Sequence, residues 1–177
     1  MEEELPAEKD SYGNTQLHYA CREPGTAALA MVVKLVRRKG TNLNARGRYG
    51  WAPVHYAAAT RQRRILEILC VAGANLQARS NENFTPIDVA LINSVAGDSY
   101  ETVCVLIANG VRLNTVHETY RRYITKELVA FERRVLQCRS AVVALLRVKR
   151  VGKLPCWDKF LLKEIAIAVW TTRYDPH

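Results

Sequence analysis

The stretch that decides the fold is Gly50–Ala57, which reads Gly-Trp-Ala-Pro-Val-His-Tyr-Ala. Two further stretches align with it without gaps, Gly13–Ala20 (GNTQLHYA) and Asn83–Ala90 (NFTPIDVA). The second and third copies begin 33 residues apart, at Gly50 and at Asn83. A box that recurs at a fixed period of about 20–50 residues is the signature of a repeat architecture. We therefore expect a stack of similar units.

Each copy of the box is followed by apolar, helix-forming residues and then by a glycine, at Gly40, Gly73 and Gly110. Thr or Pro at the head of the box suits the cap and first turn of a helix. Glycine can adopt the left-handed conformation that ends one. One such unit cannot bury its apolar face alone, whereas about three stacked units can. The sequence thus predicts three helix-turn-helix units, with four extra residues between the helices of the first and third.

The box, its period and its closing glycine resemble the ankyrin repeat family. The resemblance covers roughly residues 10–116. It implies a mostly α fold, an ankyrin-repeat solenoid whose helix-turn-helix repeats carry β-turn finger loops, followed by a C-terminal helical segment. The expected organisation is an acidic tail over 1–9, repeats over about 10–46, 47–79 and 80–116, and a helical cap or recruitment module over 117–177.

The composition agrees with a globular chain kept inside a cell. The 177 residues are 49% hydrophobic and 24% charged, which is ordinary for a soluble domain. No apolar run approaches the ~20 residues that cross a bilayer. The N-terminus, Met1–Pro6 (MEEELP), is acidic where a signal or transit peptide would be basic. We expect no membrane association and a cytoplasmic location, with the nucleus as the alternative.

The candidate chemical groups do not form a catalytic pattern. The five cysteines include no CxxC pair, so the sequence suggests neither a zinc site nor a disulfide framework. His18 and His55 belong to the box and have no paired base, nucleophile or metal-ligand spacing around them. In ankyrin repeats this histidine joins neighbouring loops through backbone hydrogen bonds, and Asp88 stands in its place in the third copy. We expect no catalytic residue, no metal, no cofactor and no enzymatic activity.

The resemblance also implies where a partner would bind. Ankyrin ligands contact the variable finger residues beside the box and the concave face formed by the first helices. Carried over, the partner-binding residues are Tyr12, Asn14, Arg48, Tyr49, Trp51, Thr60, Arg61, Asn81, Glu82 and Phe84. Tyr, Trp and Arg dominate interface energetics, which favours a binding role. The alternative is that Trp51 and Phe84 pack on neighbouring fingers and the loops need no partner.

The charge of the chain is banded. The formal net charge is +9, and residues 24–66 hold nine Lys/Arg and no acidic residue, whereas residues 67–111 hold one base and five acids. The function expected is non-catalytic binding of another protein, with an acidic surface as the preferred partner. Clustered cations could also contact a phosphate backbone. Nucleic acid is the weaker alternative, because no nucleic-acid motif is present and the third repeat is acidic.

The C-terminal third no longer carries the box. Residues 117–150 and 157–171 read as helices with wide apolar stripes. They could form a cap that closes the open end of the stack, as repeat arrays require. The alternative is an adaptor role through 136–170, because ankyrin repeats followed by a helical box are the layout of substrate receptors of cullin-type ubiquitin ligases. Leu136–Ala144 is similar in spacing to a SOCS box, and Leu154-Pro155 resembles the start of an F-box.

Overall fold

The structure is a computed structural model that describes residues 9–95 and 100–148. The chain divides into two compact units, residues 1–129 and residues 130–177. The acidic tail, except Lys9, and the F-box-like Leu154-Pro155 lie outside the described residues. The SOCS-box-like stretch Leu136–Ala144 lies within a described helix, Lys126–Val148.

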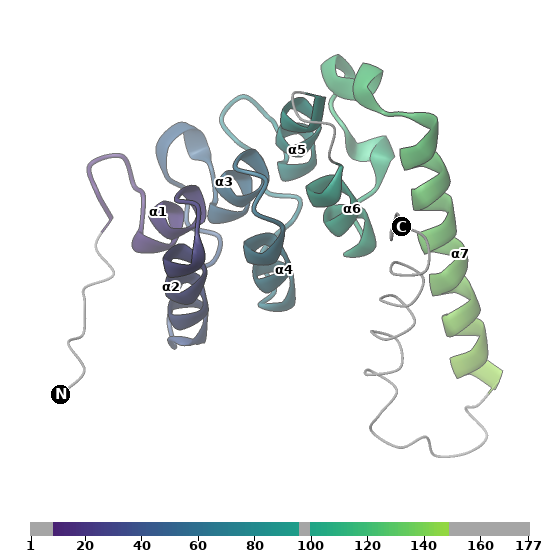
Figure 1. The fold of residues 1–177 in the computed structure, drawn as a ribbon, viewed down its shortest axis with the longest axis horizontal. Helices are drawn as coiled ribbons and strands as arrows, with labels where there is room; N and C mark the ends of the chain where they lie inside the picture. Colours follow the sequence, from purple (N-terminus) through teal and green to yellow (C-terminus); the bar gives the residue numbers. More distant parts are fainter. Residues whose placement is uncertain (1–8, 96–99, 149–177) are drawn as a thin grey trace. The chain divides into compact units, whose positions relative to one another are not determined.

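The first unit is built from pairs of antiparallel helices. The pairs are α1 (Gln16–Arg22) with α2 (Thr26–Arg37), α3 (Pro53–Ala59) with α4 (Arg63–Val71), and α5 (Pro86–Val95) with α6 (Glu101–Ala108). Helices α1, α3 and α5 pack side by side in one layer, and α2, α4 and α6 pack in a second layer (Figure 1). The loops contain short 3-10 turns, η1 (Arg48–Gly50), η2 (Leu113–Thr115) and η3 (Glu118–Tyr123).

The expected fold class is confirmed: the described residues are mostly α-helical and contain no strand. Helix α7 (Lys126–Val148) begins in the first unit and forms the described part of the second. No helix among the described residues has both the length and the apolar character that a membrane crossing requires.

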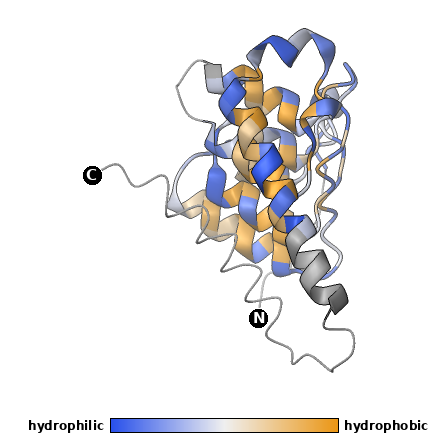
Figure 2. Cartoon of the chain, turned by 90° about the vertical axis from the view of Figure 1, so that its right-hand side faces the viewer, coloured by the Kyte–Doolittle hydropathy of each residue, from blue (hydrophilic) through white to orange (hydrophobic). Residues whose placement is uncertain are grey.

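The core explains why the box recurs. Leu17, Val54 and Ile87 occupy the same box position, and all three are buried. Leu66 and Leu106, from the second helices, are also fully buried. Hydrophobic and hydrophilic residues alternate along the helices in Figure 2, as amphipathic helices require. Full burial of one such aliphatic side chain stabilises the fold by about 1.5–3 kcal/mol.

The helix ends follow the sequence expectation. Thr15 is the N-cap of α1, and Pro53 is the first residue of α3. Gly40, Gly73 and Gly110, which follow the second helices, have φ of 83°, 86° and 100°. Only glycine takes this left-handed conformation routinely. The closing turns therefore need these three glycines.

Candidate protein-binding surface

The box histidines connect neighbouring repeats. Nδ1 of His18 accepts a hydrogen bond from the backbone N–H of Thr15, at 2.9 Å. Nε2 therefore carries the proton, and it lies 3.0 Å from the carbonyl oxygen of Ala45 and 3.1 Å from that of Trp51. Burial lowers the pKa of His18, which keeps the ring neutral. The side chain joins the first helix pair to the second finger.

The same arrangement continues along the stack. His55 Nδ1 accepts from the backbone N–H of Ala52 at 3.1 Å, and its Nε2 donates to the Phe84 carbonyl at 3.1 Å. In the third repeat Asp88 takes this place, and its Oδ1 accepts from the backbone N–H of His117 at 2.7 Å. The structure shows the linking role that the ankyrin resemblance implies. In both His18 and His55, each ring nitrogen has a hydrogen-bond partner in this role.

The two asparagines expected to contact a partner, Asn14 and Asn81, connect neighbouring fingers. Asn14 is only 7% exposed. Its Oδ1 accepts from the backbone N–H of Arg48 at 3.0 Å, and its Nδ2 donates to Asp10 at 2.9 Å. The backbone N–H of Asn81, on the third finger, donates to the Tyr49 carbonyl at 2.9 Å. These contacts fix the positions of the fingers relative to one another.

Trp51 and Phe84 are half-buried and pack on the stack. The Trp51 ring meets Tyr56 edge to face, with centroids 5.0 Å apart. Phe84 meets His117 at 5.6 Å and Tyr120 at 5.2 Å, also edge to face. Trp51 thus packs within its own repeat and Phe84 packs on residues that follow the third repeat, and each ring still leaves part of its surface open.

The most exposed aromatic side chains surround one arginine. Tyr12 is 61% exposed and Tyr49 is 55% exposed. The Arg48 guanidinium carbon lies 5.2 Å from the Tyr12 ring centroid and 4.7 Å from that of Tyr49. Within the described part of the chain, Arg48 forms no ion pair with a carboxylate. Stacking uses the faces of the guanidinium and leaves the N–H donors at its edge available.

Three further residues extend this surface, and the family pattern alone did not select them. Tyr19 and Tyr56 occupy the same box position, directly after the histidine, and Tyr19 is 41% exposed. The Arg22 guanidinium lies 5.4 Å from the Tyr19 ring centroid. Burial raises the pKa of Tyr56, while the charges of Arg22 and Arg48 partly offset that rise.

We call this set the aromatic–arginine surface. Its members are Tyr12, Tyr19, Arg22, Arg48, Tyr49, Trp51 and Tyr56. The remaining expected site residues lie elsewhere on the stack. Thr60 caps the end of α3 and donates to the Tyr56 carbonyl at 2.8 Å, and the exposed Arg61 follows it. Glu82 is exposed on the third finger. A repeated tyrosine after the box histidine is the sequence signal that could have identified Tyr19 and Tyr56.

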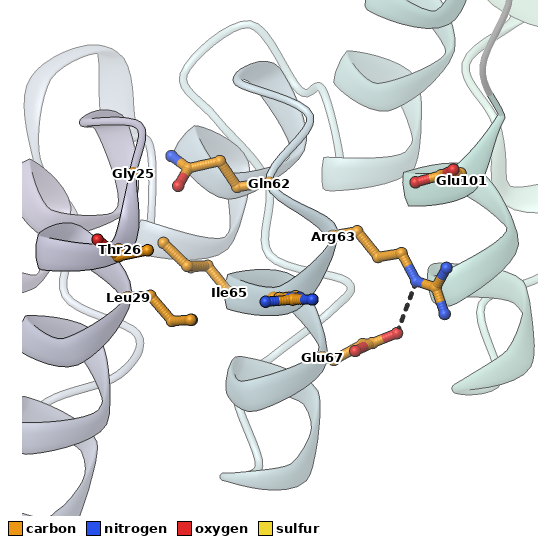
Figure 3. Close-up of a pocket in the computed structure, with 9 residues that line it drawn as sticks. Gly25, Thr26, Leu29, Gln62, Arg63, Ile65, Glu67 and Glu101 are labelled. Atoms are coloured by element: carbon orange, nitrogen blue, oxygen red, sulfur yellow. Dashed lines mark hydrogen bonds and ion pairs between the residues drawn. The ribbon is translucent and has the colours of Figure 1, made fainter.

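The thiols and one open pocket between the helices are places where reactive groups or metal ligands could lie. Burial raises the pKa of Cys21 to about 12 and that of Cys70 to about 11, so both stay protonated at neutral pH. An open pocket of about 530 Å³ lies between the starts of α2, α4 and α6 (Figure 3). Its wall carries an ion pair, in which Arg63 Nε lies 2.9 Å from Glu67 Oε1. Within the described residues, no three His, Cys, Asp or Glu side chains gather to hold a metal ion.

Comparison with known proteins agrees with the architecture. The family model for ankyrin repeats, in three copies, matches residues 17–117. An ankyrin repeat protein of Acanthamoeba polyphaga mimivirus is 34% identical over 71 residues, which is 40% of this chain. The chain covers about 10% of that relative's length.

Proposed function

This chain belongs to the ankyrin repeat family, whose members generally mediate protein–protein interactions without catalysis, and we propose that it binds a partner protein through the aromatic–arginine surface. The partner presents acidic residues to Arg48 and Arg22. An apolar or aromatic side chain of the partner packs beside the rings of Tyr19 and Tyr56. The chain itself carries out no reaction.

The observation that carries this proposal is Arg48, which is held between the exposed rings of Tyr12 and Tyr49. A side chain that is already positioned loses less conformational entropy when a partner binds. Arginine and tyrosine are also the residue types that supply most of the binding energy in protein interfaces. An arginine without a carboxylate partner in the described part of its own chain is suited to a carboxylate from another chain.

The charge distribution supports an acidic partner. Residues 24–66 contain nine cations and no anion, and both Arg48 and Arg61 lie in this segment. Uniform positive charge speeds the approach of an acidic protein and disfavours a basic one. The exposed rings provide the apolar contact that charge alone does not give.

The test is affinity purification from cell extract with the intact chain as bait. One variant removes the surface trio, Tyr12→Ala with Arg48→Ala and Tyr49→Ala. A control variant removes three exposed cations of α2 and the turn after it, Lys34→Ala with Arg37→Ala and Lys39→Ala. Quantitative mass spectrometry compares the proteins that each bait retains.

We expect a specific acidic partner that is retained by the unmodified chain and by the control but lost from the trio variant. The trio is exposed, so circular dichroism should show the same helix content for all three proteins. Retention of the partner by the trio variant would contradict the proposal. The control removes three cations and the trio variant removes one. A larger loss of the partner from the control would therefore show that net charge, rather than this surface, governs binding.

A further inference from the structure

Three non-glycine residues of the described chain have a left-handed backbone. They are Tyr49 with φ 59°, Arg61 with φ 55° and Asn83 with φ 67°. Asparagine tolerates this conformation well, whereas tyrosine and arginine do so at a cost in stability. The other left-handed residues described are all glycines: Gly13, Gly25, Gly40, Gly50, Gly73 and Gly110. The two costly exceptions, Tyr49 and Arg61, are both exposed.

The fold itself does not need a large side chain at either position. The turn between α1 and α2 places its positive φ at a glycine, the N-cap Gly25, whereas the turn between α3 and α4 places its positive φ at Arg61, one residue before the N-cap Gln62. Within the described residues, the Arg61 side chain has no hydrogen bond or ion pair. The Tyr49 ring contacts the guanidinium of Arg48, which is itself exposed. Neither side chain contributes to the core, so neither offsets the backbone strain by burial.

Strained residues of this kind concentrate at functional sites, because binding or catalysis maintains what stability alone would remove. We infer that Tyr49 and Arg61 are specificity-determining residues for an extended acidic segment of the partner protein. The inference rests on the proposed function and adds the path that the bound segment follows. The segment would run along α3, from the finger at Tyr49 to the turn at Arg61.

The distance between the Arg48–Tyr49 finger and Arg61 sets the spacing of the acidic residues in the ligand. Tyr49 and Arg48 precede the first residue of α3, and Arg61 follows its last. A helix of seven residues spans ~10 Å. An extended peptide covers that length in about three residues, and the flanking turns add about one or two more. The expected ligand therefore carries two carboxylates about three to five residues apart, one for Arg48 and one for Arg61.

The test measures stability and binding on the same variants of the full chain. Random 12-residue peptides displayed on phage are selected on the unmodified chain, and a recovered peptide is synthesised with a fluorescent label. Its dissociation constant is measured by fluorescence anisotropy for Arg61→Gly, Tyr49→Gly and the control Asn83→Gly. Asn83 has the same left-handed backbone but lies outside the proposed path.

We expect recovered peptides with paired acidic residues at the stated spacing. Arg61→Gly and Tyr49→Gly should each raise the Tm by about 1–4 °C, because glycine relieves the left-handed strain. Each should nevertheless weaken peptide binding by about fivefold or more. Asn83→Gly should change the dissociation constant by less than about twofold, because it removes no contact to the peptide.

The outcomes separate this inference from the proposed function. A lower Tm for both glycine variants would show that the side chains hold the stack, and would overturn the inference. A higher Tm with unchanged binding would also overturn it. The proposed function would still stand in that case if Arg48→Ala abolished binding. The inference and the proposed function are both contradicted if the selected peptides lack acidic residues and bind the Arg48→Ala variant as tightly as the unmodified chain. Displacement of the peptide by single-stranded DNA, with a steep salt dependence, would replace the protein partner by nucleic acid.

Discussion

At the scale of single residues, the buried histidines determine the conditions under which the repeats stay joined. His18 and His55 each accept one backbone N–H at Nδ1 and direct Nε2–H toward a carbonyl of the next finger. Protonation of Nδ1 would place two N–H groups against each other. Burial lowers the pKa of both rings, so the folded state favours the neutral form.

The stability of the chain should therefore decrease on acidification. Above the ordinary histidine pKa of 6.5, neither the folded nor the unfolded state binds these protons. Below pH 6.5 the unfolded state binds a proton at each histidine, whereas the folded state does so only at a lower pH. The free energy of unfolding therefore falls by at most ~1.4 kcal/mol per pH unit for each histidine. Urea unfolding at pH 7.5, 6.0 and 5.0 measures this, and a His55→Gln variant should show a shallower slope. A flat profile from pH 7.5 to 5.0 would show that these rings are not kept neutral.

At the scale of elements, the junction between the first two fingers is closed by a glycine that has no unusual backbone angle. A Cβ at Gly47 would overlap Asn14 Oδ1 and lie 3.1 Å from His18 Nε2. Gly73 differs, because it is left-handed and a Cβ there would meet no atom within 4 Å. The first glycine is required by close contact and the second by backbone conformation.

These two glycines give a matched pair of substitutions. Gly73→Ala should cost about 1 kcal/mol of unfolding free energy through backbone strain alone. Gly47→Ala should cost about 2–3 kcal/mol, because Asn14 and His18 must move and their hydrogen bonds weaken. Denaturant titration of both variants measures which substitution lowers the unfolding free energy more. A smaller loss for Gly47→Ala than for Gly73→Ala would contradict the described contact between the fingers.

The elements were largely predictable from the sequence because the box repeats with its spacing. The helix pairs, the closing glycines and the structural use of His18 and His55 all follow from that pattern. The environment of Asn14 does not, because its partner is the backbone N–H of Arg48, 34 residues further along. The same is true of η3, whose residues lack the box and are placed by packing against α5.

The candidate surface was predicted only in part, for a physical reason. Arg48, Tyr49 and Tyr12 are variable finger residues, so the family pattern indicates them. Tyr19 lies inside the box, where a sequence reading assigns residues to packing, and only its 41% exposure shows otherwise. The left-handed backbone of Arg61 depends on the turn between α3 and α4, and arginine gives no local signal for it.

At the scale of the whole molecule, the role of the C-terminal third remains a prediction from sequence. We propose that residues 117–177 include a helical cap for the stack. Apolar surface is worth about 25 cal/mol per Å² when buried, so the wide stripe of residues 157–170 has to be covered. Deletion of residues 152–177 should then lower the Tm and cause aggregation, as measured by differential scanning fluorimetry and light scattering. A truncated chain as stable as the whole, having lost only an elongin-like or Skp-like adaptor, would favour the recruitment alternative.

The central claim is that one face of the repeats, around Arg48, binds an acidic protein segment. Hydrogen–deuterium exchange of the intact chain, free and saturated with the selected acidic peptide, tests it most directly. We predict slower exchange on binding in residues 10–14, 46–51 and 56–62, with little change in α2 or α7. Protection concentrated in α2 or α7, with the fingers unchanged, would contradict the account.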